Sequence, residues 1–174
     1  MAVILKTDGL NKVYRLGSFT RNTQIRALND VNILVESDQP VIISVVGESG
    51  SGKTTLAKTL LRLVEPSSGT VTIYDKLVAG KGVHTPKKAF LASVQPIFQN
   101  PFEAFSRYRP VDSYLFETAD RVAGLGKVEA VHAVENALSQ VGLEYADVRD
   151  KYSNQFSGGE LQRVSIARAL IPKP

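Results

Sequence analysis

The spacing of apolar and polar positions predicts strands that alternate with helices. Short apolar runs rich in β-branched residues open the chain and predict antiparallel strands at residues 3–5, 25–28 and 31–35. Val41–Val46 is apolar on both faces, with Ser44 inside it, which is typical of a strand buried in a parallel sheet. Further strands are predicted at 71–74 and 94–98.

Apolar residues at helical spacing predict helices at residues 53–63, 111–123, 127–141 and 157–170. Leu56, Leu60 and Leu63 would line one face of the first helix, and Pro172 would stop the last. Together the strands and helices predict one α/β domain with a helical insertion near residues 110–156.

A glycine-rich turn follows the Val41–Val46 run and precedes the first predicted helix. It matches the spacing Gly, four residues, Gly-Lys-Ser/Thr, with the residues Gly47, Glu48, Ser49, Gly50, Ser51, Gly52, Lys53, Thr54 and Thr55. Glycine permits the torsions that turn backbone N–H groups toward a triphosphate, and the helix N-terminus favours the same anion. The pattern therefore predicts an ATP site, in which Lys53 contacts the phosphates and Thr54 ligates Mg²⁺. The alternative is a plain glycine-rich turn between a strand and a helix.

A second motif opens the last predicted helix. Phe156 is followed by Ser157, Gly158, Gly159 and Glu160. Ser157 as N-cap and Glu160 three residues later form a capping box, which by itself would be a purely structural feature. The two glycines leave the helix N-terminus bare, and such an end binds anions. Ser157 and the adjacent amides could thus contact a γ-phosphate.

The second motif resembles the signature of ABC-family ATPases, usually Leu-Ser-Gly-Gly-Gln, from which Phe156 and Glu160 depart. Together with the phosphate loop, it identifies the chain as similar to an ABC ATP-binding subunit over essentially its whole length. The resemblance implies a P-loop NTPase fold of ABC type, with an N-terminal antiparallel β-subdomain, a partial parallel-sheet core and a helical insertion. The segments 47–52, 99–103 and 152–155 are closest to the oligopeptide and dipeptide importer branch, although Ser153 stands where that branch usually has proline.

The same resemblance implies roles for two single residues. Tyr14 corresponds to the aromatic residue that stacks on adenine; alternatively, it is an ordinary aromatic of the small sheet. Gln99 corresponds to the glutamine that reaches Mg²⁺ and the attacking water; alternatively, it is a glutamine at the end of a strand. The catalytic candidates are therefore Lys53 and Gln99, and the metal candidates are Thr54 and Gln99.

The family resemblance also implies partners. A second ATPase subunit would pair head to tail, so that Ser157–Glu160 acts on the partner's ATP. Membrane permease subunits would dock on residues 98–111, which are rich in Phe, Tyr and Pro. We expect no direct contact with nucleic acid. The leading hypothesis is ATP-driven import of a solute, most plausibly a peptide; the alternatives are a soluble ABC ATPase acting on nucleic acid or ribosomes, and a non-hydrolysing nucleotide-binding remnant.

The expected domain covers residues 1–174 and is incomplete at its C-terminal end. Its parts are a β-subdomain (1–40 and 70–80), a P-loop core (41–69 and 81–100), a helical subdomain (101–156) and a signature helix (157–174). In the family the next strand, the Walker B segment, carries an Asp for Mg²⁺ and then the catalytic Glu. We therefore expect these 174 residues alone to bind ATP but not to hydrolyse it well. His84 and His132 precede the signature, so neither is the family's switch histidine, and both are expected to be surface residues.

The composition of the chain only limits the kinds of site and of location that are expected. The net charge of +4 is modest, and the basic residues are scattered. The absence of cysteine excludes a disulfide scaffold and a thiolate metal site. Residues 1–14 do not read as a signal peptide, and no segment approaches the roughly 20 apolar residues that span a bilayer. We therefore expect a cytoplasmic location on the inner face of the membrane, through a permease.

Overall fold

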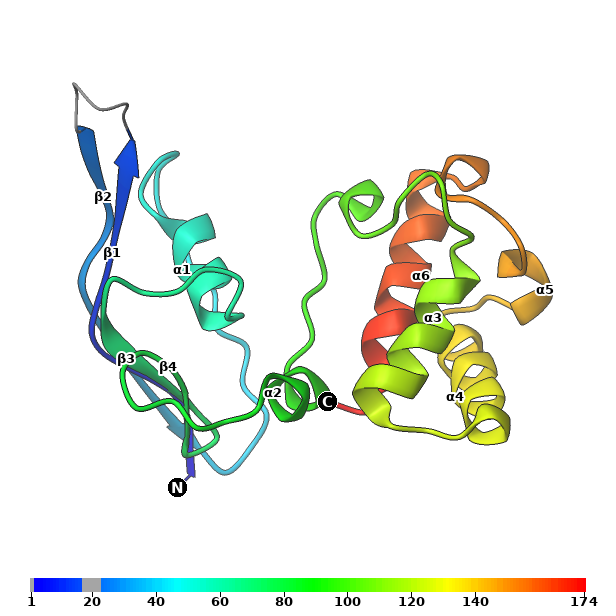
Figure 1. Cartoon of the computed structure of the whole chain (residues 1–174), viewed down its shortest axis with the longest axis horizontal. Coiled ribbons are helices and arrows are strands. Elements are labelled where there is room, and N and C mark those ends of the chain that lie inside the picture. The colour runs from blue at the N-terminus through cyan, green and yellow to red at the C-terminus, as the bar shows by residue number, and fades with distance from the viewer. Residues whose placement is uncertain (1, 17–22) are drawn as a thin grey trace. The chain divides into compact units, whose positions relative to one another are not determined.

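The structure is a computed structural model that describes residues 2–16 and 23–174. The chain forms two compact units, Met1–Thr85 and Pro86–Pro174 (Figure 1). Within these described residues, the strands and one helix lie in the first unit, and the second unit is helical. Each unit has its own buried residues and is described in turn.

Unit 1 is built on an antiparallel sheet of four strands in the order β2-β1-β3-β4. The strands are β1 Ala2–Leu16, β2 Thr23–Ser37, β3 Ser68–Ile73 and β4 Lys76–Ala79. The predicted short strands at the start are thus parts of two long ones. The pairing of β1 with β2 shifts register between Thr7 and Lys12, so β1 continues through its polar residues. Residues 29–30, between the strands predicted at 25–28 and 31–35, belong to β2 as well.

The hairpin between β3 and β4 is tight because two residues take left-handed torsions. Tyr74 and Asp75 have φ values of 47° and 59°. A two-residue hairpin turn needs such positive φ values so that its twist matches the twist of the strands. Leu10 and Val71 are fully buried on one face of the sheet. The predicted strand at 71–74 is confirmed in type, but it ends at Ile73.

Helix α1, Lys53–Leu60, follows the glycine-rich turn and packs beside β2. Leu56 and Thr59 are its buried residues, so one face of the helix covers the sheet. The helix is three residues shorter than predicted. Arg62 takes a φ of 55°, and the N–H of Leu63 bonds back to the carbonyl of Lys58 at 2.8 Å, which closes the last turn.

The parallel-sheet core expected from the sequence is not formed. Residues 41–46 and 94–98 are not strands, and Ile42 and Val46 are 97% and 91% exposed. A strand is stable only when its N–H and C=O groups pair with a neighbour, and no strand among the described residues lies beside either segment. The apolar side chains of residues 41–46, which predicted burial, are therefore exposed, whereas residues 94–98 are half-buried except for Ile97.

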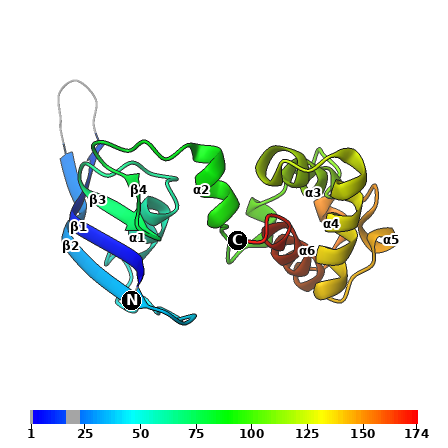
Figure 2. The ribbon, with the colours of Figure 1, turned by 90° about the horizontal axis from the view of Figure 1, so that it is seen from below.

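Unit 2 is a helical body around one hydrophobic core (Figure 2). Its elements are α2 Lys87–Ser93, η1 Pro101–Glu103, α3 Asp112–Thr118, η2 Ala119–Ala123, α4 Lys127–Gln140, α5 Tyr145–Val148, η3 Ser153–Gln155 and α6 Gly158–Leu170. Leu115, Leu138 and Leu161, from α3, α4 and α6, are fully buried in the shared core. The helices predicted at 111–123, 127–141 and 157–170 are confirmed. The first of them consists of α3 followed by η2, a π-helical turn that ends before Gly124.

Candidate functional site

The glycine-rich loop at Gly47–Thr55 has backbone torsions that only glycine adopts readily. Gly50 and Gly52 have φ values of 83° and 93°, and the N–H of Ser51 donates to the carbonyl of Glu48 at 3.2 Å. A Cβ on Gly52 would lie 2.3 Å from the carbonyl oxygen of Ala27 on β2. Residue 52 must therefore be glycine both for its torsion and for its space.

Lys53 turns back over this loop. Its Nζ donates to the carbonyl oxygens of Gly47 at 2.7 Å and Glu48 at 2.6 Å, and lies 3.5 Å from Ser51 Oγ. These bonds hold the ammonium against the backbone of the loop. The lysine thus closes the loop and supplies its positive charge.

The donors around Lys53 match the chemistry of a nucleotide phosphate. Helix α1 starts at Lys53, with Gly52 as its N-cap, and its first turn has no acidic residue. The first N–H groups of a helix have no acceptor within the helix, and its dipole favours an anion there. Thr54, in the same turn, is exposed, so its hydroxyl is accessible to a metal ion. The residues present therefore fit ATP with Mg²⁺.

Tyr14 lies on β1 in the same unit as the loop, opposite Ile25 of β2. It is half-buried, and the ammonium of Lys12 sits 5.1 Å from the centre of its ring. Lys12 itself is held by the carbonyl of Glu65 at 2.6 Å. Tyr14 is thus a sheet aromatic in position, and one face of its ring carries a cation contact. Adenine stacking on this ring stays a prediction.

In unit 2, the signature segment forms the expected capping box. Ser157 caps α6: its hydroxyl accepts from the N–H of Glu160 at 3.3 Å, and its N–H donates to Glu160 Oε2 at 2.8 Å. The Ser157 hydroxyl also contacts that carboxylate at 2.7 Å. These backbone and side-chain bonds from Ser157 lower the pKa of Glu160. Gly158 and Gly159 have open space where a Cβ would stand, so the start of the helix is uncovered.

Gln99 is exposed and precedes a short turn in unit 2. Asn100 caps that turn, η1, because its side chain accepts from the N–H of Phe102 at 3.2 Å. Tyr14 and the phosphate loop therefore both belong to unit 1, whereas Gln99 and the signature both belong to unit 2.

Two side chains of α6 were missed by the sequence analysis. Gln162 Nε2 donates to the carbonyl of Phe98 at 3.3 Å, and Arg168 donates to Thr118 Oγ1 at 3.0 Å and to the carbonyl of Ala104 at 3.4 Å. Burial lowers the pKa of the Arg168 guanidinium. Both residues occupy polar positions between buried ones on the helix that carries the signature, and this pattern was the signal that the sequence offered.

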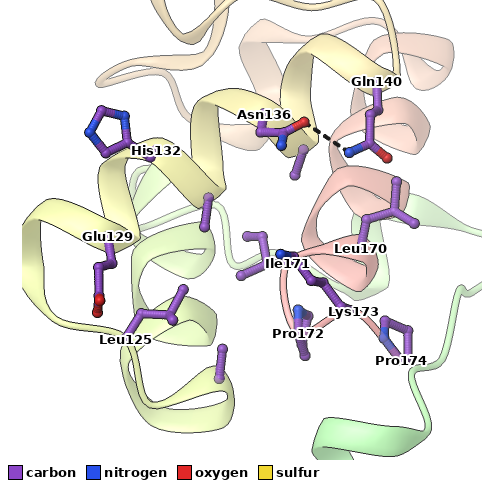
Figure 3. Close-up of a pocket in the computed structure, with 13 residues that line it drawn as sticks. Leu125, Glu129, His132, Asn136, Gln140, Leu170, Ile171, Pro172, Lys173 and Pro174 are labelled. Carbon is purple, nitrogen blue, oxygen red and sulfur yellow. Dashed lines mark hydrogen bonds between the residues drawn. The ribbon is translucent and has the colours of Figure 1, made fainter.

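One pocket in unit 2 is lined by none of the predicted site residues. Figure 3 shows a pocket of about 660 Å³ between α4 and the end of α6, lined by Leu125, Leu170 and Ile171 among others. His132 is at its rim and is exposed, as is His84, so both surface predictions are confirmed. The described part of the chain holds no cluster of three potential metal-binding His, Asp or Glu residues. None of its helices is long and apolar enough to cross a membrane.

Comparison with known proteins gives consistent results. Residues 28–174 match the family model described as ABC transporter. The chain is 33% identical to the di/tripeptide transport ATP-binding protein DppF of Pseudomonas aeruginosa over 176 residues, covering 100% of the chain and 53% of DppF. It is 35% identical to the nickel import ATP-binding protein NikE of Shigella boydii, covering 98% of the chain and 63% of NikE. The chain thus spans about half the length of the first of these relatives.

Among solved structures, the chain resembles the ATP-binding cassette MJ0796 in a dimeric, post-hydrolysis state bound to ADP and Pi. The TM-score is 0.73 at 24% identity, over 98% of this chain and 70% of that one. This likeness shows the fold of a P-loop ATPase cassette, as the sequence predicted. With the family match over most of its length, the chain belongs to the ABC transporter family.

Proposed function

We propose that this chain is the ATP-binding domain of a subunit that couples ATP to solute import through a membrane permease. The observation that carries the proposal is the phosphate loop: glycine at position 52 is required by the backbone of β2, and Lys53 is fixed over the loop. Membership of the ABC transporter family supports the coupling to transport. Residues 1–174 would form one such domain, and ATP and Mg²⁺ would be its cofactors.

In this proposal the loop amides and Lys53 hold the phosphates, and Tyr14 contacts adenine. Mg²⁺ would supply charge neutralisation at the β- and γ-phosphates, with Thr54 and Gln99 among its ligands. The chain's own contribution is positional, because the amides and the ammonium are held in place by the bonds described above. Lys53 Nζ donates to two loop carbonyls, so a phosphate oxygen would replace one of these acceptors while the ammonium stays beside the loop.

Peptides are the proposed substrate class. DppF is named for di- and tripeptides and several other relatives for peptide import, whereas NikE is named for nickel. The resemblance of residues 99–103 and 152–155 to the peptide branch favours peptides. Uptake of labelled dipeptides by cells with and without the intact gene would test this choice, with nickel uptake measured in the same cells as the alternative.

Residues 98–111 are the proposed permease contact. A pocket of about 480 Å³ there is lined by Phe102, Phe105, Arg107, Tyr108, Ser153 and Asn154. Phe102 and Tyr108 are 48% and 86% exposed, and exposed aromatic residues around a hollow are typical of protein interfaces. Docking there would place the subunit on the inner face of the membrane.

The proposed pairing with a second ATPase subunit is head to tail, with ATP between the phosphate loop of one chain and Ser157–Gly159 of the other. The family resemblance supports this arrangement, because it implies that the predicted phosphate loop and the signature meet on one nucleotide only across two chains. The interface would then have two equivalent nucleotide sites. MJ0796 is a dimeric cassette, and we propose the same state for this chain.

Sedimentation velocity with and without MgATP tests the pairing. Gly159→Asp and Gly159→Ala form a matched pair, since a Cβ at this position meets nothing within 4 Å. We expect MgATP to produce dimers of the parent and of Gly159→Ala, while the carboxylate of Gly159→Asp repels the partner's phosphate and keeps the chain monomeric. Monomers of the parent at saturating MgATP would contradict the pairing.

A further inference from the structure

Helix α6 holds the segment Phe98–Ala104 at both of its ends. Gln162, near the start of the helix, donates from Nε2 to the carbonyl of Phe98 at 3.3 Å. Arg168, near its end, donates from Nη1 to the carbonyl of Ala104 at 3.4 Å. The segment between these carbonyls contains Gln99 and begins the proposed permease contact.

The contact made by Gln162 has a defined direction. A carbonyl oxygen only accepts, so the amide nitrogen of Gln162 must face Phe98. Its Oε1 is then buried, and no donor reaches it among the described residues. A buried acceptor without a partner is unfavourable. The side chain is thus held in this orientation by the bond to Phe98, although the orientation leaves its other end unpaired.

Arg168 is tied down by more than one neighbour. Its Nε donates to Thr118 Oγ1 at 3.0 Å, and its guanidinium lies 5.4 Å from the ring centre of Tyr114 and 6.0 Å from that of Phe105. A planar cation packed against two rings has few alternative positions. The carbonyl of Ala104 is therefore bonded to a rigid donor.

The segment is also stiff between its two ends. The N–H of Phe102 bonds to Asn100 Oδ1, that of Glu103 to the carbonyl of Asn100, and that of Ala104 to the carbonyl of Pro101, at 3.0–3.2 Å. A short turn closed by three bonds and fastened at both ends moves with the helix that fastens it.

We propose that Gln162 and Arg168 are positioning residues that make Phe98–Ala104 and the signature helix one mechanical body. A push on the permease contact would then shift Ser157 at the start of α6, and a phosphate bound at Ser157 would shift Gln99 and Phe102. The proposal rests on the function proposed above, and it adds the two side chains that connect the permease contact to the nucleotide contact.

Hydrogen exchange tests the fastening without any ligand. In the double variant Gln162→Leu with Arg168→Met, the amides of Phe102, Glu103 and Ala104 should exchange about tenfold faster, since local opening no longer breaks the bonds to α6. The control Gln140→Leu with Arg163→Met makes the same chemical changes at exposed positions and should exchange as the parent does. Unchanged exchange in the double variant would overturn the proposal. Gln162→Leu alone should melt at the parent's temperature, because it removes the unpaired Oε1 together with the bond.

A spin label at Phe102→Cys tests the transmission, and the chain has no other cysteine to react. We expect MgATP to change the label's mobility in the parent background, and not in the double variant, while both bind a fluorescent ATP analogue with affinities within about twofold. The single variant Arg168→Lys retains Gln162 and a cationic donor at position 168. Its label response should therefore lie between that of the parent and that of the double variant. An equal label response in parent and double variant would overturn the transmission. If the parent does not bind ATP at all, the proposed function is wrong. The hydrogen-exchange result still tests whether Gln162 and Arg168 hold the segment Phe98–Ala104 on α6.

Discussion

Gly52→Ala is predicted to damage the phosphate loop through two separate effects. The first is torsional, since an L-residue at a φ of 93° costs about 1–2 kcal/mol. The second is steric, because the new Cβ would lie 2.3 Å from the carbonyl oxygen of Ala27, closer than real Cβ contacts come. Relief requires α1 or β2 to shift, and overpacking of this kind costs about 1–3 kcal/mol. The sum is roughly 2–5 kcal/mol, against a total stability on the order of 5–15 kcal/mol.

Gly50→Ala is the matched control. Its φ of 83° gives nearly the same torsional cost, but a Cβ there meets nothing within 4 Å. We therefore expect Gly50→Ala to lose only about 1–2 kcal/mol. The difference between the two variants measures the contact of the loop with β2.

Urea unfolding followed by circular dichroism suits this chain, which has no tryptophan. The midpoint should fall further for Gly52→Ala than for Gly50→Ala, with equal slopes for the three proteins. Binding of an ATP analogue should weaken more in Gly52→Ala as well. Equal losses in the two variants would refute the steric argument, and no loss in either would refute the loop geometry.

Two further predictions concern the other site residues. Tyr14→Phe should bind ATP nearly as the parent does and Tyr14→Ala less well, in a fluorescence titration, because only the ring face is needed for stacking; equal binding by all three would make Tyr14 a sheet residue only. The lowered pKa of Glu160 means that its bonds to Ser157 stabilise the chain above the ordinary value of 4.5 and are lost as the pH falls through the lowered pKa. An NMR titration should show this, and Ser157→Ala should move the pKa part of the way back toward 4.5, because the backbone N–H of residue 157 still donates to the carboxylate. An unmoved pKa would assign the shift to that backbone bond and not to the Ser157 hydroxyl.

Local sequence signals predicted helices α1, α3, α4 and α6 and the capping box, but not the shorter helices α2 and α5. The Ser157 and Glu160 pair is set by neighbours in the chain, so its geometry follows from the sequence alone. The same holds for the glycine torsions of the phosphate loop, because Gly50 and Gly52 take the left-handed conformations that the motif requires.

Sequence reasoning failed where structure depends on distant partners. Val41–Val46 has the composition of a buried strand, but composition does not supply the neighbouring strand that its backbone needs, and Ile42 and Val46 are exposed. Gln162 and Arg168 were missed for the same reason. Their acceptors, Phe98 and Ala104, are each 64 residues away along the chain.

The central claim is that the loop at Gly47–Thr55 binds ATP through Lys53, and titration of Lys53→Ala with a fluorescent ATP analogue tests it most directly. A hydrogen bond from a charged donor is worth about 1.5–3 kcal/mol, so the variant should bind at least about tenfold more weakly than the parent. Lys58→Ala, at an exposed position later in the same helix, is the control and should bind as the parent does. Equal affinity of Lys53→Ala and the parent would contradict the account.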